Sequence, residues 1–297
     1  MRPSFKVALT LCVSLIAAAL NAAPPRVDVM ARTIWSSDSE EFGGISGLEV
    51  GANGISFTAV SDTGLLYRGT LERSDEGAIE GVSLLQMYPL LFEGGKRPTE
   101  KRYRDTEGLA ISGSQTLHIS AEGKSRVLRY AEKEPNPIVT SLPSLDGSKP
   151  SNMGFEALAI TSSGLLVAIP EKSANIQSPY DVFQKDETGK WEVIYRLPRR
   201  GVFRPVGADF GPDGHLYVLM RAFNGFAFAT RIERIVFKDS APISHENIFA
   251  GRFGQFDNLE GLATWQAGPN DLRLVAISDD NFSRMQSTEI VEFRLQE

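Results

Sequence analysis

Five copies of one short pattern run through the sequence, and this repetition constrains the fold more than any other feature. Each copy opens with a phrase of small, polar and apolar residues and continues into a short apolar strand. A glycine-rich or polar turn follows, and then a second apolar strand. Internal repeats of this size are typical of propellers, solenoids and arrays, in which neighbouring units bury a shared core. The five openings are Ile45-Ser46-Gly47-Leu48, Thr106-Glu107-Gly108-Leu109, Phe155-Glu156-Ala157-Leu158, Gly207-Ala208-Asp209-Phe210 and Leu259-Glu260-Gly261-Leu262.

The second strand ends at an acidic residue in four of the five copies. A third strand of alternating character follows in every copy, and a weaker fourth strand follows in four of them. Alternation with a period of two indicates half-buried β-strands, and no long stretch outside the leader has the 3.6-residue period of a helix. The sequence therefore predicts an all-β protein. The five endings are Val60-Ser61-Asp62, Ile119-Ser120-Ala121-Glu122, Ile169-Pro170-Glu171, Leu219-Met220-Arg221 and Ile277-Ser278-Asp279-Asp280.

The spacing of the repeats predicts the architecture. The openings lie at residues 46, 107, 156, 209 and 260, so successive copies are 49 to 61 residues apart. The fifth copy lacks a fourth strand, and the N-terminal segment 27–35 alternates as a strand does. We therefore expect a β-propeller of five four-stranded blades, the last closed by the N-terminal strand, because closure leaves no long exposed edge. Six blades remain an alternative if the longest step hides a degenerate unit. A sandwich or two small β domains is the other alternative, although no Pro/Ser-rich linker marks a boundary.

The first 23 residues have the composition of a secretory signal peptide. Arg2 and Lys6 precede an apolar run over residues 7–20, and the small residues Ala22 and Ala23 follow. The run is too short to span a bilayer. We expect residues 24–297 to form a single domain in the periplasm or outside the cell. Cys12, the one cysteine, lies inside this leader, so the rest of the chain can form no disulfide, thiolate metal site or cysteine nucleophile.

The charge and motif content exclude several classes of function. The chain carries a net charge of −6 and has no basic run, which disfavours nucleic acid and anionic membranes as partners. Loss of Arg2 and Lys6 with the leader makes the remainder more acidic. Phosphate-binding loops and dinucleotide fingerprints are absent. Gly44-Ile45-Ser46-Gly47 lacks the spacing of a serine-hydrolase nucleophile elbow.

Acidic residues recur at the openings and the endings of the copies. An antiparallel hairpin brings the start of its first strand and the end of its second to the same end of a blade, so we expect both sets to crowd one face. Neighbouring carboxylates cannot all stay ionised without a counter-charge. Hard oxygen ligands without cysteine or clustered histidine select Ca²⁺, with Mg²⁺ as the alternative. The candidate metal ligands are Glu107, Glu156, Glu260 and Asp209 at the openings, and Asp62, Glu122, Glu171 and Asp279 at the endings.

Other interpretations of these residues remain open. Acids beside turns, such as Asp62 and Asp280, also cap turns by accepting backbone N–H bonds. Lys124 and Lys172 follow ring acids, and Arg221 replaces an acid in the fourth copy, which makes these three candidates for substrate binding. A cation beside a carboxylate-bound metal suits a small anionic substrate such as a phosphate ester. The sequence assigns no catalytic residue.

Several phrases resemble the bacterial phytase-like family described by the "esterase-like activity of phytase". The resemblance covers essentially all of the chain after the leader, and it implies an exported propeller that hydrolyses phosphoric esters with calcium. The chain departs from the family at Leu219-Met220-Arg221, where an acid is expected before the arginine. A non-catalytic ligand- or partner-binding propeller and a metal-dependent lactonase or esterase are the alternatives. The matching phrases include Phe42-Gly43-Gly44-Ile45-Ser46-Gly47-Leu48, Arg104-Asp105-Thr106-Glu107-Gly108-Leu109, Asn152-Met153-Gly154-Phe155-Glu156-Ala157-Leu158, Asp257-Asn258-Leu259-Glu260-Gly261-Leu262 and Ser278-Asp279-Asp280-Asn281-Phe282-Ser283.

Overall fold

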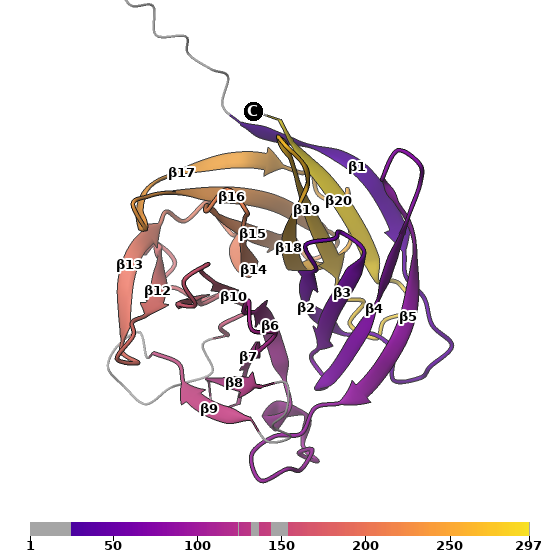
Figure 1. Ribbon diagram of the computed structural model, residues 1–297, viewed down its shortest axis with the longest axis horizontal. Coiled ribbons are helices and arrows are strands. Elements are labelled where there is room, and N and C mark those ends of the chain that lie inside the picture. The colour runs from indigo at the N-terminus through magenta and orange to yellow at the C-terminus, as the bar shows by residue number, and fades with distance from the viewer. Residues whose placement is uncertain (1–24, 124, 132–136, 144–153, 297) are drawn as a thin grey trace, which may run out of the picture.

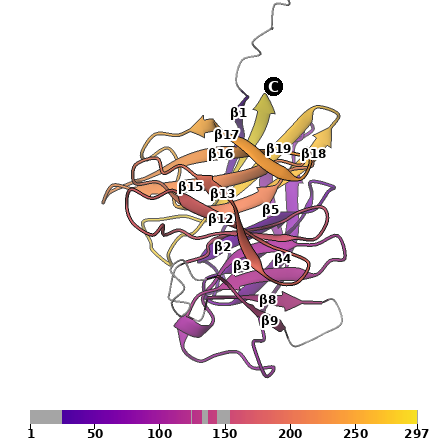
Figure 2. The same ribbon diagram turned by 90° about the vertical axis from the view of Figure 1, so that its left-hand side faces the viewer.

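A computed structural model describes residues 25–123, 125–131, 137–143 and 154–296. In these residues the chain forms five antiparallel sheets of four strands each, arranged as blades around a central axis (Figure 1). Figure 2 shows the blades from the side, with their connecting loops at the two ends. The predicted all-β propeller of five blades is confirmed. The predicted leader, residues 1–23, lies outside the described residues, as does Lys124.

The strands of each blade follow one another along the chain, and the first strand of each blade contacts the first strands of its two neighbours. Blade 1 contains β2 (Ile45–Val50), β3 (Ser56–Ser61), β4 (Leu65–Arg73) and β5 (Ile79–Pro89). Blade 2 contains β6 (Thr106–Ile111), β7 (Leu117–Ala121), β8 (Arg126–Tyr130) and β9 (Ile138–Ser141). Blade 3 contains β10 (Ala157–Ile160), β11 (Leu166–Ile169), β12 (Tyr180–Lys185) and β13 (Trp191–Leu197). Blade 4 contains β14 (Arg204–Phe210), β15 (Leu216–Phe223), β16 (Phe228–Lys238) and β17 (Ala241–Ala250).

The fifth blade joins the two ends of the described chain. Its strands β18 (Leu259–Gly268), β19 (Asp271–Ser278) and β20 (Glu289–Gln296) are completed by β1 (Arg26–Ile34). Strand β1 pairs antiparallel with β20, from Arg26 opposite Gln296 to Ile34 opposite Glu289 (Figure 1). The predicted closure by the N-terminal strand is therefore confirmed. The fifth sheet thereby gains the fourth strand that the other blades have, with β1 as its outermost strand.

The long first step of the repeat does not hide a sixth blade. Its additional residues lie in the long strands β4 and β5 and in the connection from β5 to β6, which contains the short 3₁₀ helix η1 (Lys101–Tyr103) and an isolated bridge between Phe92 and Lys96. These residues add length to one loop without forming another four-stranded sheet. The alternative of six blades is thereby excluded for the described chain.

The hydrophobic core is divided among the interfaces between neighbouring blades. The described residues form five buried clusters, and each takes side chains from two adjacent sheets. One cluster, for example, packs Tyr67 and Phe57 of blade 1 against Trp265 and Ile277 of blade 5. Burial at every interface stabilises the ring as a whole, because each blade covers one apolar face of the next.

Glycines let the innermost strands approach one another closely around the axis. A Cβ added at Gly108 would lie 2.5 Å from the carbonyl oxygen of Glu156, and one added at Gly207 would lie 2.3 Å from that of Glu260. Gly47 and Gly261 have similarly close neighbours, and Ala157 takes this place in blade 3. The axis holds a void of only about 10 Å³ at this level. The propeller is thus packed through its centre, and the loops at its ends are the places where polar groups gather.

Within the described residues, no helix has the length and apolar character needed to cross a bilayer.

Substituting alanine for Gly108 is expected to destabilise the fold by about 1–3 kcal/mol, because the new methyl group overlaps the neighbouring inner strand. Gly113 in the same blade is a matched control, since a Cβ there meets nothing within 4 Å. Gly113→Ala should change the free energy of unfolding by less than about 0.5 kcal/mol. Urea denaturation measures both changes. Equal effects of the two substitutions would contradict the close packing of the inner strands.

Candidate functional site

One backbone hydrogen bond recurs in four blades and brings the openings and the endings to the same end of the propeller. The residue that follows the second strand donates its N–H to a carbonyl two residues before the opening position. The pairs are Asp62 to Gly44 (2.8 Å), Glu122 to Asp105 (2.8 Å), Glu171 to Gly154 (2.7 Å) and Asp279 to Asn258 (3.0 Å). Both predicted sets of acids therefore occupy one face, except at the fourth opening.

A β-bulge lies at the opening position in blades 1, 2, 4 and 5. The strand pairing shifts around Ser46, Glu107, Val206 and Glu260. A bulge bends its strand and re-aims the side chain of the extra residue. In blade 3 the corresponding residue, Glu156, stands directly before β10. The bulges explain why these side chains leave the alternating pattern of the inner strands and gather near the axis.

In blade 4, the residue that corresponds to the ring glutamates lies three residues before the one expected from the sequence. Val206, not Asp209, occupies the position of the ring glutamates, because Gly207 takes the place of the glycine at which a Cβ would overlap the neighbouring inner strand. Asp209 lies further along β14, where its Oδ2 accepts hydrogen bonds from the N–H and hydroxyl of Thr264, both at 2.7 Å. Burial raises the pKa of Asp209 to about 7. The expectation that Asp209 joins the acidic ring is therefore corrected.

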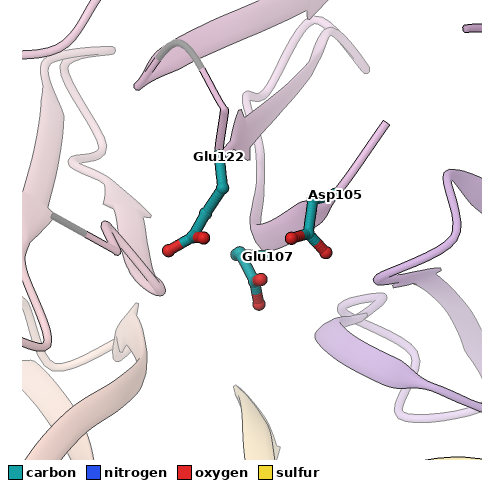
Figure 3. A group of neighbouring side chains, drawn as sticks. All are labelled: Asp105, Glu107 and Glu122. Atoms are coloured by element: carbon teal, nitrogen blue, oxygen red, sulfur yellow. The ribbon is translucent and has the colours of Figure 1, made fainter. Parts of the chain in front are cut away.

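Three carboxylates in blade 2 form the tightest acidic group. Asp105 directly precedes β6, Glu107 is its second residue, and Glu122 follows β7; one oxygen of each lies within 4.8 Å of the others. Figure 3 shows the three side chains converging from separate parts of the blade. Asp105 is not among the ligands expected from the sequence. Its position two residues before Glu107 was the available signal, because alternate residues of an extended chain point the same way.

Burial and repulsion between the carboxylates raise the pKa values of this group and so favour the protonated forms. Burial raises the pKa of Asp105 to about 6, with a further contribution from the charge of Glu122. The pKa of Glu107 is raised well above its ordinary value, first by burial and then by the charges of Glu156 and Glu260. Both effects disfavour ionised carboxylates that have no neighbouring cation. The three acids are therefore arranged to gain from a bound positive charge.

Arg221 pairs with two glutamates across the centre of the ring. Its guanidinium forms a close ion pair with Glu260, and its Nη2 lies 3.9 Å from Oε2 of Glu156. The buried amide of Asn258 links the group, since its Oδ1 accepts from Arg221 at 2.8 Å and its Nδ2 donates to Glu260 at 2.9 Å. Arg221 thus supplies one positive charge at the position where the other blades carry an acid.

Basic side chains at the edge of the ring neutralise some of the outer acids. Lys101 of η1 lies 2.6 Å from Asp62, while Lys172 and Arg204 lie 2.9 Å and 3.2 Å from the carboxylate of Glu171. Burial alone would raise the pKa of Glu171, but the hydrogen bonds and charges of Lys172 and Arg204 lower it below its ordinary value. Lys172 is therefore placed at the site, as is Lys101, which the sequence analysis did not single out.

The two neighbouring aspartates after β19 have different environments. Burial, with the charge of Glu260 second, raises the pKa of Asp279 to about 8, although its Oδ1 accepts the N–H of Asn281 at 2.6 Å. Asp280 accepts the N–H groups of Gly44 and Phe282, each at 3.0 Å. Asp280 therefore has the turn-capping arrangement that the sequence left as an alternative, and Asp279 belongs to the acidic cluster.

The complete cluster contains more carboxylates than paired cations. Oδ1 of Asp62 and Oε2 of Glu156 are buried and accept no hydrogen bond from the residues that the structure describes. All candidate donors are hard oxygen atoms, which suit Ca²⁺ or Mg²⁺ rather than softer metals. The residues present therefore fit a divalent cation. We call this group the acidic cluster; its members are Asp62, Asp105, Glu107, Glu122, Glu156, Glu171, Glu260 and Asp279.

Among solved structures, that of a sugar dehydrogenase supports the fold. The PQQ-bound aldose sugar dehydrogenase from Streptomyces coelicolor aligns with a TM-score of 0.50 and 14% identity, over 92% of this chain and 100% of that one. Virginiamycin B lyase from Staphylococcus aureus aligns at 13% identity over 92% of this chain and 99% of that one, with a TM-score of 0.40. At 14% identity, the alignment with the dehydrogenase shows a similar fold and carries no information about activity. No curated protein matches the chain in sequence.

A family model matches residues 40–282, a span that includes the whole acidic cluster and four complete blades. The model is the one described as phytase-like, with esterase-like activity of phytase. This match agrees with the resemblance carried by the opening and ending phrases, and it covers most of the chain. The protein therefore belongs to the phytase-like family.

Proposed function

We propose that the protein is an exported, calcium-dependent hydrolase of phosphoric esters that works at the acidic cluster. The observation that carries this proposal is the convergence of Asp105, Glu107 and Glu122 beside the Arg221–Glu260 ion pair. Family membership supports the reaction class. The leader at residues 1–23 supports a location in the periplasm or outside the cell.

The three acids of blade 2 are the proposed primary ligands of the ion. The charges of Glu156 and Glu260 raise the pKa of Glu107, so these two carboxylates extend the supply of oxygen donors. Asp279 is in turn influenced by the charge of Glu260. Calcium accepts six to eight oxygen ligands in flexible geometry, which suits a crowded carboxylate site better than the strict octahedron of magnesium. When bound, such an ion polarises a phosphoryl oxygen and lowers the pKa of a water molecule.

Arg221 and Lys172 are the proposed contacts to the phosphate group. Nη1 of Arg221 is engaged by Asn258 and Glu260, whereas its Nη2 approaches Glu156 only to 3.9 Å. In this proposal Nη2 donates to a phosphate oxygen. Lys172 is half-exposed beside Glu171 and adds a second positive charge. Lys124 remains a third candidate.

In the proposed reaction, water attacks phosphorus and the bond to the alcohol oxygen breaks. One proton of the water passes to a carboxylate of the cluster, and a protonated carboxyl group of the cluster gives a proton to the alcohol oxygen, so that the cluster as a whole neither gains nor loses a proton.

Arg221 also gives specific support to a second candidate function. Its ion pairs neutralise part of the charge that would otherwise require a cation, and they tie blades 3, 4 and 5 together. A binding propeller stabilised by ions but without turnover would use the same contacts. Release of inorganic phosphate separates this alternative from the hydrolase, since binding alone produces no phosphate. A metal-dependent lactonase or carboxylic esterase would hydrolyse its own substrates without releasing phosphate.

Replacing Glu107 by glutamine should lower calcium-dependent phosphate release by about 100-fold, because it removes a negatively charged oxygen ligand of the proposed ion. The measurement is phosphate release from phytate and from a simple phosphomonoester, with calcium and with a chelator. Glu187→Gln is a matched control, since Glu187 is exposed in the turn between β12 and β13. Full activity of the Glu107→Gln variant, or wild-type activity that is indifferent to chelation, would refute the proposed role of the ion.

Calcium should raise the melting temperature more at high pH than at low pH. The raised pKa values of Asp105, about 6, and Asp279, about 8, mean that the ion-free native state retains protons that the unfolded chain has released. The contribution of these two carboxyl groups to the stability of the ion-free protein is therefore greatest below about pH 4, and it is lost as the pH rises through their native pKa values. A bound cation offsets this loss.

At calcium concentrations near 100 times the dissociation constant, we expect a gain of about 5 °C at pH 8 and a much smaller gain at pH 5. Thermal melts with calcium and with chelator at both values measure it. Glu107→Gln should reduce the gain, whereas Glu187→Gln should leave it intact. A calcium effect of equal size at the two pH values would contradict the electrostatic account.

A further inference from the structure

Large apolar side chains are exposed around the acidic cluster on blades 4 and 5. Phe226 is 96% exposed and Met285 is 94% exposed, and Phe223 and Phe282 are each about half-exposed. Phe223 and Phe226 belong to the β15–β16 hairpin, and Phe282 and Met285 belong to the connection from β19 to β20. Both connections follow the second strand of a blade, so they lie at the end that carries the acids. Exposed apolar groups gathered beside a polar site mark a place of ligand contact.

The β15–β16 hairpin extends past the level of the acidic cluster. In other blades the second strand ends at or before the acid, but in blade 4 the pairing continues beyond Arg221 to Phe223 opposite Phe228. The rings of Phe223 and Phe228 lie 4.7 Å apart. Phe223 stands two residues after Arg221, so its side chain leaves the same face of the strand. The hairpin therefore carries an aromatic ring immediately outside the guanidinium that faces the ring of acids.

The turn of this hairpin is ordered by its own hydrogen bonds. Oδ1 of Asn224 accepts the N–H groups of Phe226 and Ala227, at 3.0 Å and 2.9 Å, and Gly225 supplies the positive φ that the turn requires. Phe226 is thus held at the tip of a defined turn and contributes almost nothing to the core. Its ring is therefore exposed to solvent at the end of the propeller that carries the acids.

Phe282 is held beside the cluster in a backbone conformation that bulky residues rarely adopt. Its φ is +50°, and that of Asn281 is +49°. Hydrogen bonds from the two N–H groups to Asp279 and Asp280 maintain this conformation. A Cβ at Gly44 would lie 2.3 Å from Oδ1 of Asp62 and 2.7 Å from the Phe282 ring, so that ring borders the acidic cluster. Strained residues of this kind are concentrated at ligand sites.

The charges at the site limit the ligands that fit it. Arg221, Lys172 and a bound cation attract one anionic group, but the surrounding carboxylates repel a molecule with many negative charges. The exposed aromatic rings gain more from contact with an apolar group than from contact with a polar polyol, because burial of apolar area is the main source of their binding energy. The site therefore combines a small anion-binding centre with an apolar border on one side.

We propose that the substrate is a singly phosphorylated ester whose alcohol half carries a bulky aryl or alkyl group, and that Phe282 and the β15–β16 hairpin determine this preference. This inference rests on the proposed hydrolase function. The phosphate group lies over the acidic cluster, and the apolar half of the ester lies against Phe282, Phe223 and Phe226. A small polar alcohol such as glycerol leaves these rings in water.

The test compares kcat/KM for 1-naphthyl phosphate and glycerol phosphate. Phe282→Asn removes the ring, while asparagine tolerates a positive φ, so the variant should fold. The substitution should lower kcat/KM for naphthyl phosphate about tenfold more than that for glycerol phosphate. Phe226→Ser should act in the same direction. Ile243→Ser, at an exposed position on β17, is the matched control and should change neither value.

Equal losses of kcat/KM for the two substrates in Phe282→Asn, or no preference in the wild-type protein, would overturn the inference and leave the hydrolase function intact.

If neither ester is hydrolysed, the hydrolase function fails. The inference is then decided by calorimetric binding of 1-naphthyl phosphonate and methyl phosphonate in the presence of calcium. Binding of the naphthyl compound that Phe282→Asn leaves unchanged would overturn it. Vesicle binding that Phe226→Ser abolishes, with the ester preference unchanged, would assign the rings to a lipid surface and would also overturn it.

Discussion

The close approach of the five inner strands around the axis is the constraint on which the site depends. Glycines such as Gly108 and Gly207 allow this approach, because any larger residue would overlap the backbone of the next blade. Pairing of β1 with β20 holds the ring closed. Within such a ring, residues at equivalent positions of different blades have to meet, and bulges at the openings turn their side chains toward the common centre. Packing alone thus brings the acids together before any ligand is present.

The electrostatic consequence is a cluster whose charge is only partly balanced. Lys101, Lys172 and Arg204 neutralise acids at its edge, and Arg221 is shared by Glu156 and Glu260. Burial, with the charges of neighbouring acids, raises the pKa values of Asp105 and Glu107. Burial also raises the pKa of Glu122, although the charge of Lys172 opposes it. A native state that holds buried carboxylates together is stabilised by protons or by a cation. Stability and function are therefore expected to depend on the same ion.

Repetition made the architecture and most of the cluster predictable from the sequence, and the errors arose where the repetition fails. The expected alignment of Asp209 is incorrect because apolar Val206 stands where the other copies have an acid or serine. Asp209, three residues later, is the acid that lies nearest to this position. Asp105 has no acidic counterpart in the other copies, where the corresponding residues are Gly44, Gly154 and Asn258, so its spacing from Glu107 is the one signal that points to it. Lys101 lies in a connection that no other blade shares. The positive φ of Phe282 depends on hydrogen bonds to side chains and has no sequence signature.

A crystal structure from crystals grown in calcium, with anomalous scattering used to locate the ion, tests the proposed metal site most directly. We predict one strong anomalous peak coordinated by carboxylate oxygens of Asp105, Glu107 and Glu122, with the Arg221–Glu260 pair retained beside it. A structure in which these three side chains point away from one another, or in which calcium at millimolar concentration gives no peak there, would contradict the central claim.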